Sequence, residues 1–569
     1  MQTVSAAMIT AAGASVRYPV PKFEVQWDGV NWLDESANIV GFRLTQQMEI
    51  PGVELTPLGT TDAGSVTLRN REWRYSPWHS GGDDDIRDYI DGAWGYTGIK
   101  ARLSMGFGLS NTAITVFADA GGGLVRATSA GHGLEIGNAV RIVNSQGYDG
   151  RYTVAAKTAS TFDFAATWGS NTAQGWAQKL EFCRLFTGYL YNGSEAPRTK
   201  SITFALRDNA WLLYQKRAST ALYANYRLDT LLYTLANAGG WDVVNDWTAD
   251  TSPFIIPAAW LDDDALLQEM QQAAASVGGR LWCDANGDLR YEEASHWLGH
   301  ATVLWHFDAG DLMDLPPVLA PENLASSVVV EYSPRVTGAS RVLYTLDETR
   351  TVRPGTTETL DVRMSQPAVS VFPLNADTDY WFDNGAGLAM NSKMALAVTY
   401  YAQRLTITMT NSHATMPAVL RFLQIRGKPM EGGPQEEVEE IIDASPDVPR
   451  VRSVRGNFYL QSRQQARYVS KLLAGRHDSL IPLWHIRSAP GIPQLELGDR
   501  VGVYDARALS AEREGFVLSI EHRYTVPAGL ATEPIYAQDI HVMDATPLFP
   551  SGAYFVIGTT ALGSGVAWY

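Results

Sequence analysis

Residues 260–291 carry two hydrophobic periods in succession. Apolar and small side chains first recur at helical spacing, at Ala265, Leu266, Met270, Ala273, Ala274 and Val277. Three aspartates at 262–264 precede this stripe, where the positive end of a helix dipole favours negative charge. A Gly-Gly pair at 278–279 follows it and is typical of a helix end. The pattern predicts a helix that begins near the aspartates and ends at the glycines.

Two short alternating runs follow this helix, at 280–283 and 289–291. A period of two is typical of strands with one buried face. Asn286-Gly287 lies between the runs and is the pair that most readily adopts positive φ in a tight hairpin turn. We therefore expect one helix packed on one hairpin.

Strand patterns dominate residues 23–107 and return near residue 200. Val66 and Leu68 alternate with polar neighbours, which predicts a strand with one buried face. In the run 201–207 two faces separate in the same way, with Thr203, Ala205 and Arg207 on one and Ile202, Phe204 and Leu206 on the other.

Two further helices are expected. Asp229 and Thr230 can cap a helix that ends at Gly239-Gly240. Ser462 can cap another helix, whose inward residues would be Ala466, Val469, Leu472 and Leu473. Gly498-Asp499 then predicts a turn before a strand that contains Val501 and Val503.

Residues 110–178 interrupt the order of the strands. The strand at 99–108 finds its expected partner only at 180–194. Glycines at 131, 133, 137, 147 and 150 punctuate short strands between the two, as a small β barrel or sandwich requires. We interpret 110–178 as an inserted small β domain.

The length and charge of the chain narrow its class. A chain of 569 residues is expected to form about three to five domains. The 61 acidic against 45 basic residues give a formal charge of −16, which disfavours nonspecific binding to duplex DNA. No run reaches the roughly 18 apolar residues that a membrane-spanning helix requires. The two cysteines, Cys183 and Cys283, are interpreted as buried thiols, with a single disulfide as the less favoured alternative.

Several residues suggest a metal site, and for each there is an alternative structural role. His132 stands in a GHG turn without a second ligand, so a turn role is favoured. His296, His300 and His306 suggest zinc, but the sequence HWLGH lacks the Glu of a metalloprotease helix. Calcium is suggested in two places, by the loop residues Asp284, Asn286 and Asp288 and by the acidic run Asp83, Asp84, Asp85, Asp88 and Asp91. Neither has the spacing of a calcium loop, so we predict no metal site.

Catalytic groupings are equally incomplete. Asp499 with His485 or His522 would make an acid–base pair, but no nucleophile motif accompanies them. The GSG at 563–565 lacks the spacing of a G-x-S-x-G elbow. We therefore predict no catalytic, cofactor-binding or metal-binding residue, no cofactor, and a protein that is not an enzyme.

The order of several motifs resembles phage tail-tip hub proteins, which also build the baseplate hub of contractile tails. These motifs are SVTLRNREWRYSPW, GIKARLSMGF, GGRLWCDANGDLRYEE and a late helix with Gln-Ala followed by LGDRV. The family usually has Gly in the Asn-Arg-x-Gly turn, whereas Glu72 and Trp73 fill that place here. The inserted stretch, HGLEIGNAVRIVNSQGYDGRYTVAAKTASTFDF, resembles a small β module common in phage tail proteins.

The resemblance implies a mainly β, multidomain fold with α+β lobes and two tail-tube-like β barrels per chain. The first barrel would be discontinuous and the second would be completed late in the chain. The expected domains are an N-terminal arm at 1–22, a first barrel at 23–109 and 179–215, the insertion at 110–178, an α/β accessory lobe at 216–300, a β-rich part of the second barrel with an accessory lobe at 301–430, an acidic Gly/Pro linker at 431–450, the rest of the second barrel at 451–545 and an apolar tail at 546–569.

The resemblance also implies a function. The chain would be a virion protein of the tail tip, made in the cytoplasm of the bacterial host. A homotrimer would adapt the sixfold tail tube to a threefold tip, hold the end of the tape-measure protein and let DNA pass without specific binding. Its partners would be the distal tail or tail-tube ring, the tape-measure protein and other tail-tip or fibre proteins. A lumen lined by the acidic excess would repel phosphate.

Two functions from other classes stay open. A receptor-binding or carbohydrate-binding tail protein would display the module at 110–178 outward. A tail-associated hydrolase is less favoured, because no paired-carboxylate or metal motif is present. The tail at 546–569 is apolar and almost uncharged, so we expect it to pack on a neighbouring subunit.

Overall fold

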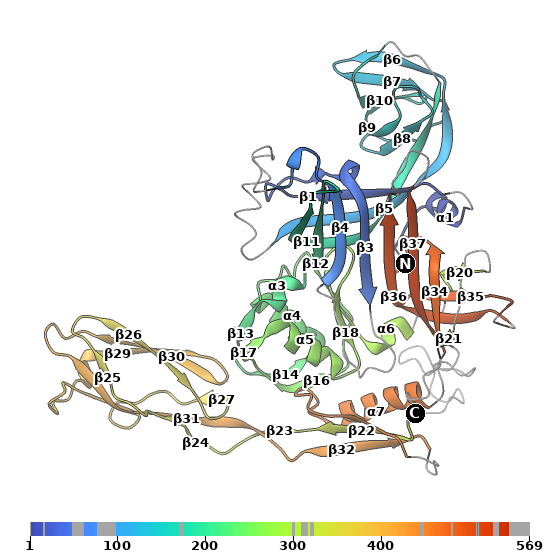
Figure 1. The fold of residues 1–569 in the computed structure, drawn as a ribbon. Helices are drawn as coiled ribbons and strands as arrows, with labels where there is room; N and C mark the ends of the chain where they lie inside the picture. Colours follow the sequence, from blue (N-terminus) through green and yellow to red (C-terminus); the bar gives the residue numbers. More distant parts are fainter. Residues whose placement is uncertain are drawn as a thin grey trace.

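The computed structural model describes residues 2–14, 17–47, 62–76, 98–169, 174–298, 302–308, 317–318, 324–443, 449–478, 482–507, 509, 511–526 and 534–545. The fold is mainly β and is divided into several sheets with short helices (Figure 1), which confirms the expected mainly β, multidomain class. Within the described ranges no helix is long and apolar enough to cross a membrane. The acidic run at 83–91, His300 and the tail at 546–569 lie outside these ranges.

An N-terminal strand set forms the left part of the central sheet in Figure 1. Its hydrogen-bonded order is β2-β1-β5-β11-β12-β4-β3, and all pairs are antiparallel. The strands are β1 (Pro19–Val25), β2 (Leu33–Asp34), β3 (Ile39–Gln47), β4 (Asp62–Arg69), β5 (Ile99–Ile114), β11 (Gly175–Ala196) and β12 (Ser201–Asp208), with short 3₁₀ turns η1 (Ser36–Asn38) and η2 (Arg71–Trp73). The predicted alternation in β4 and β12 is confirmed, because Val66, Leu68 and Phe204 are buried.

A C-terminal strand set continues the same sheet. It contains β20 (Trp305–Phe307), β21 (Pro317–Val318), β34 (Leu483–Pro490), β35 (Arg500–Val503), β36 (Arg513–Thr525) and β37 (Ile535–Asp544). The seam is the antiparallel pair β3–β36, from Gly41 opposite Thr525 to Gln47 opposite Ser519. The two sets therefore share one open sheet, and no closed barrel is formed by the described strands.

The hydrophobic core lies on one face of this sheet and crosses the seam. Phe23, Leu103 and Phe204 are buried in the N-terminal part, and Phe516 and Ile540 in the C-terminal part. In addition, two tyrosines of the C-terminal set, Tyr524 and Tyr536, belong to the N-terminal core. The ring of Tyr524 stacks on that of Phe42 at a centroid distance of 5.6 Å. The apolar packing thus holds the two sets together.

The N-terminal arm is ordered over its described part. Helix α1 (Ala6–Gly13) begins at Ser5, whose hydroxyl accepts a hydrogen bond from the amide of Met8 at 3.1 Å. Met8 is buried against the core of the N-terminal set. The amide of Gln2 donates to the carbonyl of Gln494 at 2.9 Å, so the arm contacts the C-terminal half of the chain as well.

The inserted module stands at the top of the molecule in Figure 1. Its strands are β6 (Val116–Gly121), β7 (Leu124–Thr128), β8 (Ala139–Val143), β9 (Gly150–Lys157) and β10 (Thr161–Ala165). They enclose a separate core that includes Phe117, Phe162 and Phe164. The ends of β5 and β11 extend into the module, where β8 pairs with β11.

An α/β lobe follows the first strand set. It contains α3 (Trp211–Tyr214), β13 (Arg217–Ser219), β14 (Tyr223–Arg227), α4 (Leu228–Ala238), β15 (Trp247–Ala249), β16 (Ile255–Ala259), β17 (Asp262–Ala265), α5 (Leu266–Ala275), β18 (Arg280–Cys283), β19 (Leu289–Glu292) and α6 (Ala294–Leu298). The predicted helix and hairpin are present as α5 and β18–β19, and Gly278 has a positive φ of 68° after the helix.

In the hairpin loop at 284–288, Gly287 has a positive φ of 90° and the Asp284 carboxylate accepts the amide of Asn286 at 2.9 Å. Two local predictions for this lobe are wrong. The aspartates at 262–264 form β17, which pairs with β13, so that α5 begins only at Leu266. Helix α4 has no side-chain cap; Asp229 lies in its first turn and pairs with Arg227.

Helix α7 (Arg463–His477) covers a small sheet of β22 (Ser327–Tyr332), β32 (Glu436–Ile441) and β33 (Val451–Val454). The predicted cap is confirmed, since the Ser462 hydroxyl accepts the amide of Gln465 at 3.2 Å. Residues 436–441, expected in an exposed linker, instead form strand β32 because β22 offers a free edge to pair with.

A β-sandwich, here called the side sandwich, extends to the left in Figure 1. Its strands are β23 (Arg335–Thr337), β24 (Arg341–Thr345), β25 (Arg350–Val352), β26 (Thr357–Arg363), β27 (Ala368–Val371), β28 (Tyr380–Asp383), β29 (Met394–Tyr400), β30 (Arg404–Asn411) and β31 (Ala418–Gly432), with the 3₁₀ turn η4 (Asn391–Lys393). The long strand β31 pairs with five of them, whereas β30 pairs with β26 and β29. Asp262 of the α/β lobe anchors the sandwich by binding Arg363 and Arg404.

Candidate assembly surface and module joint

The histidines that suggested metal chemistry have local roles. His132 is buried, its Nδ1 accepts the amide of Leu134 at 3.0 Å, and its Nε2 lies 3.1 Å from the carbonyl of Thr158. This geometry fixes a turn, as predicted. His296 contacts the Asp250 carboxylate at 3.0 Å, and His306 contacts Glu512 at 2.5 Å.

The Asp284 loop is organised by hydrogen bonds within the chain. Asp284 Oδ1 accepts the amides of Asn286 and Asp288, and Oδ2 lies 2.6 Å from Arg290 Nη2. Both carboxylate oxygens therefore already have protein partners. In the part of the chain that the structure describes, no group of three or more His, Cys, Asp or Glu side chains is placed to hold a metal ion.

The suggested acid–base pair is not formed with His522. Asp499 Oδ2 accepts the amide of Glu496 at 2.7 Å and so shapes the Gly498-Asp499 turn. His522 binds Tyr536 and Gln538 instead. His485 stacks on His541 with ring centroids 4.2 Å apart.

Both cysteines are free thiols. Burial raises the pKa of Cys183 to about 12 and also raises the pKa of Cys283. Because the thiolate is the reactive form, these thiols are poor nucleophiles at neutral pH.

The polar face of the central sheet carries a chain of ion pairs across the seam. Arg43 Nη2 on β3 lies 2.7 Å from Glu521 Oε2 on β36. Glu521 also accepts a hydrogen bond from Arg523, which in turn binds Asp539 on β37. Burial opposes ionisation of Glu521, but hydrogen bonds from Arg43 and Arg523 outweigh it and lower the pKa of this carboxyl. Two cations and two anions here leave no net charge.

A polar network is buried at the seam on the opposite face of the sheet from these ion pairs. His522 Nδ1 lies 2.8 Å from the Tyr536 hydroxyl and 3.1 Å from Gln538 Nε2. The Gln538 side chain also bonds to both the amide and the carbonyl of Ile492. Burial lowers the pKa of His522 to about 3, so the ring is neutral at pH 7.

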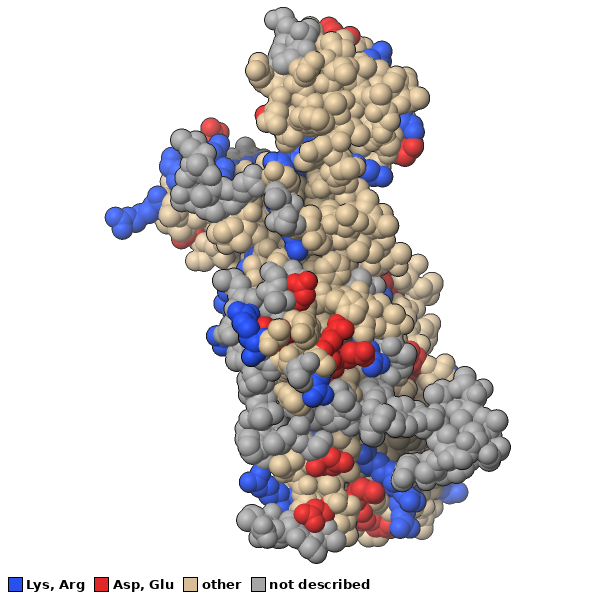
Figure 2. All heavy atoms as spheres, turned by 90° about the vertical axis from the view of Figure 1, so that its right-hand side faces the viewer, with Lys and Arg blue, Asp and Glu red and all other residues tan. Residues whose placement is uncertain are grey.

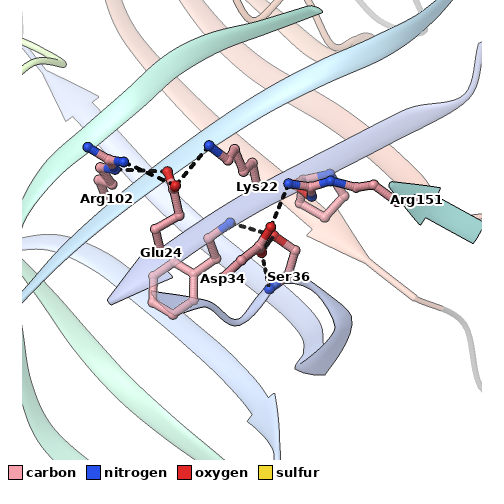
Figure 3. A network of polar contacts seen from close by, with 8 residues as sticks. Lys22, Glu24, Asp34, Ser36, Arg102 and Arg151 are labelled. Atoms are coloured by element: carbon pink, nitrogen blue, oxygen red, sulfur yellow. Dashed lines mark hydrogen bonds and ion pairs between the residues drawn. The ribbon is translucent and has the colours of Figure 1, made fainter. Parts of the chain in front are cut away.

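The module is joined to the body by strands and by one arginine. Arg151 on β9 reaches down to the N-terminal set, with Nη2 2.7 Å from Asp34 Oδ2 and Nη1 3.2 Å from the carbonyl of Pro21 (Figure 3). Asp34 also accepts the amide of Ser36 at 2.9 Å. These contacts add to the continuous strands β5 and β11, which run from the body into the module.

A second ion-pair group lies beside this contact (Figure 3). Glu24 accepts hydrogen bonds from Arg102 Nε at 2.8 Å and Nη2 at 3.0 Å, and Lys22 Nζ lies 2.8 Å away. Burial opposes ionisation of Glu24, but the hydrogen bonds from Arg102 and Lys22 outweigh it and lower its pKa. This group thus joins β1 to the first half of β5 by charge as well as by backbone pairing.

The solved structures that match the chain include two tail proteins. A 43 kDa tail protein of prophage MuSo2 from Shewanella oneidensis is 10% identical, with a TM-score of 0.41 and coverage of 92% of this chain and 100% of the other. A tail protein from Neisseria meningitidis MC58 is 7% identical, with a TM-score of 0.42 and coverage of 93% and 97%. No protein-family profile and no curated protein sequence matches the chain.

The sequence alone did not point to the module joint. Arg151 and Asp34 are 117 positions apart, so no local pattern connects them. The sequence did contain a signal for the pairing of Arg141 with Arg151. These two residues flank the turn at 144–149 and lie opposite each other if that turn closes a hairpin. The ion pairs of the seam had no signal, since the pairing of β3 with β36 joins opposite ends of the chain.

Proposed function

We propose that this chain is a structural virion protein, the hub of a phage tail tip, and acts without catalysis. Three copies would form a ring that closes the sixfold tail tube or adapts it to a threefold tip. The observation that carries this proposal is the seam β3–β36, which joins two strand sets edge to edge in one chain. A trimer then presents six strand sets, which is the number that a sixfold tube requires.

The two outer edges of the row suit closure by neighbouring copies. In the described part of the chain, β1 pairs with β2 only at Glu24 and Val25, and β34 pairs with β21 only at Trp484 and Leu483. Exposed strand edges favour pairing with another chain, and ring closure removes such edges. The tail-tube ring above, the tape-measure protein inside and fibre proteins outside are the proposed partners.

The polar face of the seam is proposed to line the channel. Its ion pairs between Arg43, Glu521, Arg523 and Asp539 are balanced. A wall without net charge neither traps nor strongly repels DNA phosphates. On the side drawn in Figure 2, basic and acidic side chains are likewise interspersed rather than segregated. Passage of DNA through such a channel needs no specific binding.

Single-particle imaging of the purified protein, with its mass in solution measured in parallel, tests the proposal. We expect a threefold ring with a central opening. If the purified protein is monomeric, intact virions are imaged next. A position away from the tail axis there would contradict the hub.

Receptor or carbohydrate binding at the tail periphery is the second candidate, favoured by the module, which stands as a separate β unit with its own core at the top of the molecule in Figure 1. Ile114 and Gly175 are directly paired, so residues 115–174 can be replaced by an Asn-Gly turn that keeps β5 and β11 in register. Intact tails that no longer adsorb to cells would support the binding role. Loss of tails would support a structural role for the module.

A further inference from the structure

A cavity of about 270 Å³ lies where the module meets the N-terminal set. Two arginines of the module, Arg141 and Arg151, line one side. Tyr18, Val20, Leu180 and Pro534 of the body supply aromatic and apolar walls. This volume is slightly below the usual range of small-ligand pockets, about 300–1,000 Å³, so it has room for no more than one small molecule.

The two arginines are placed directly opposite each other. Arg141 on β8 is the register partner of Arg151 on β9. Like charges in this position repel and destabilise a sheet. Arg151 is neutralised by Asp34 and by the carbonyl of Pro21. For Arg141 the contact within the described residues is the ring of Tyr18, with the guanidinium carbon 5.3 Å from the ring centroid.

The surplus charge at this joint is positive, although the whole chain carries a formal charge of −16. Figure 2 shows Lys and Arg atoms at the neck between the module and the body. Among the residues that line the cavity, Arg141 and Arg151 are the charged ones. A bound anion would offset the repulsion between these cations.

We propose that this cavity binds an acidic sugar residue. The Arg141 guanidinium has a planar set of donors that matches a carboxylate. The ring of Tyr18 and the side chains of Val20 and Leu180 offer a surface for the apolar face of a sugar ring. A bare anion would use the arginine but leave these walls unfilled. The site depends on the module joint alone and not on the proposed trimer.

Isothermal titration calorimetry on the full chain, with D-glucuronic acid as the probe, tests the site. D-glucose and inorganic phosphate are the comparison ligands. We expect glucuronate to bind more tightly than either. Arg141→Gln should weaken glucuronate binding about 10- to 100-fold, because a charged hydrogen-bond partner is lost. Lys157→Gln is the matched control, since Lys157 lies on the same module and pairs with Glu135.

A thermal melt separates a binding role of Arg141 from a structural role. Without ligand, Arg141→Gln should melt at the same temperature as the native chain or higher, because a repulsion with Arg151 is removed. Glucuronate should raise the melting temperature of the native chain only. A lower melting temperature of the unliganded variant would show that Arg141 is structural. Equal binding of glucose, equal binding of phosphate, or unchanged binding by Arg141→Gln would each overturn the acidic-sugar site.

Discussion

Single buried polar residues determine how the strand sets are held. Glu35 is 1% exposed, and its carboxylate accepts hydrogen bonds from Trp27 Nε1 at 2.9 Å, Tyr75 Oη at 2.5 Å and Arg74 Nη2 at 2.9 Å. Burial and the neighbouring Glu35 charge both raise the pKa of Tyr75, so its hydroxyl remains a donor. A carboxylate with this many donors is stable in an apolar core.

Glu35→Ala should therefore destabilise the N-terminal strand set by about 3–5 kcal/mol, because several buried donors lose their acceptor. Glu135→Ala is the matched control: Glu135 also forms an ion pair, with Lys157, but is exposed. Its loss should cost far less than that of Glu35, because an exposed ion pair is screened by water. Urea unfolding followed by tryptophan fluorescence measures both. Equal effects of the two substitutions would refute the role of the buried network.

His522 should make stability dependent on pH. Its pKa is about 3 in the folded chain and 6.5 in the reference state, so the unfolded chain binds more protons between these values. Stability is therefore lost as the pH falls below 6.5, by about 2.5 kcal/mol between pH 7.5 and pH 4.5. His522→Gln should lack this component. Urea unfolding at both pH values checks it, and an identical pH dependence of variant and native chain would argue against a neutral buried ring.

At the scale of elements, periodicity and caps predict helices and strands correctly where these depend only on residues close in sequence. Helix α7 begins after Ser462, as its cap predicts, and Ala466, Val469 and Leu473 are buried, while Leu472 is only partly so. Elements that depend on a distant partner were misread. The aspartates of β17 are a strand because β13 pairs with them, and the glutamates of β32 are a strand because β22 does.

Ser462→Ala should destabilise α7 by about 1 kcal/mol, since the amide of Gln465 loses its acceptor. Gln464→Ala, on the exposed side of the same helix, should stay within about 0.5 kcal/mol of the native chain. Hydrogen exchange of the first-turn amides of α7 gives the measurement. Faster exchange in the Gln464 variant than in the Ser462 variant would contradict the cap.

For the whole molecule, assembly is the decisive property. The residues after Pro550 are apolar and almost uncharged, and we expect them to pack on a neighbouring subunit. A chain truncated after Pro550 should fold but fail to form the ring. Light scattering combined with circular dichroism distinguishes the two effects. Normal assembly of the truncated chain would show that the tail is not part of the subunit interface.

The sequence by itself determined the properties that depend on near neighbours. These are the mainly β class, the alternation in β4 and β12, the capped helix α7 and the turn role of His132. Only the tertiary structure decided the seam β3–β36, the ion pair of Arg151 with Asp34 and the position of Arg141 beside the ring of Tyr18. The reason is physical: periodicity, caps and turns are set over a few residues, whereas strand partners and charge neighbours are chosen by the packing of the whole chain.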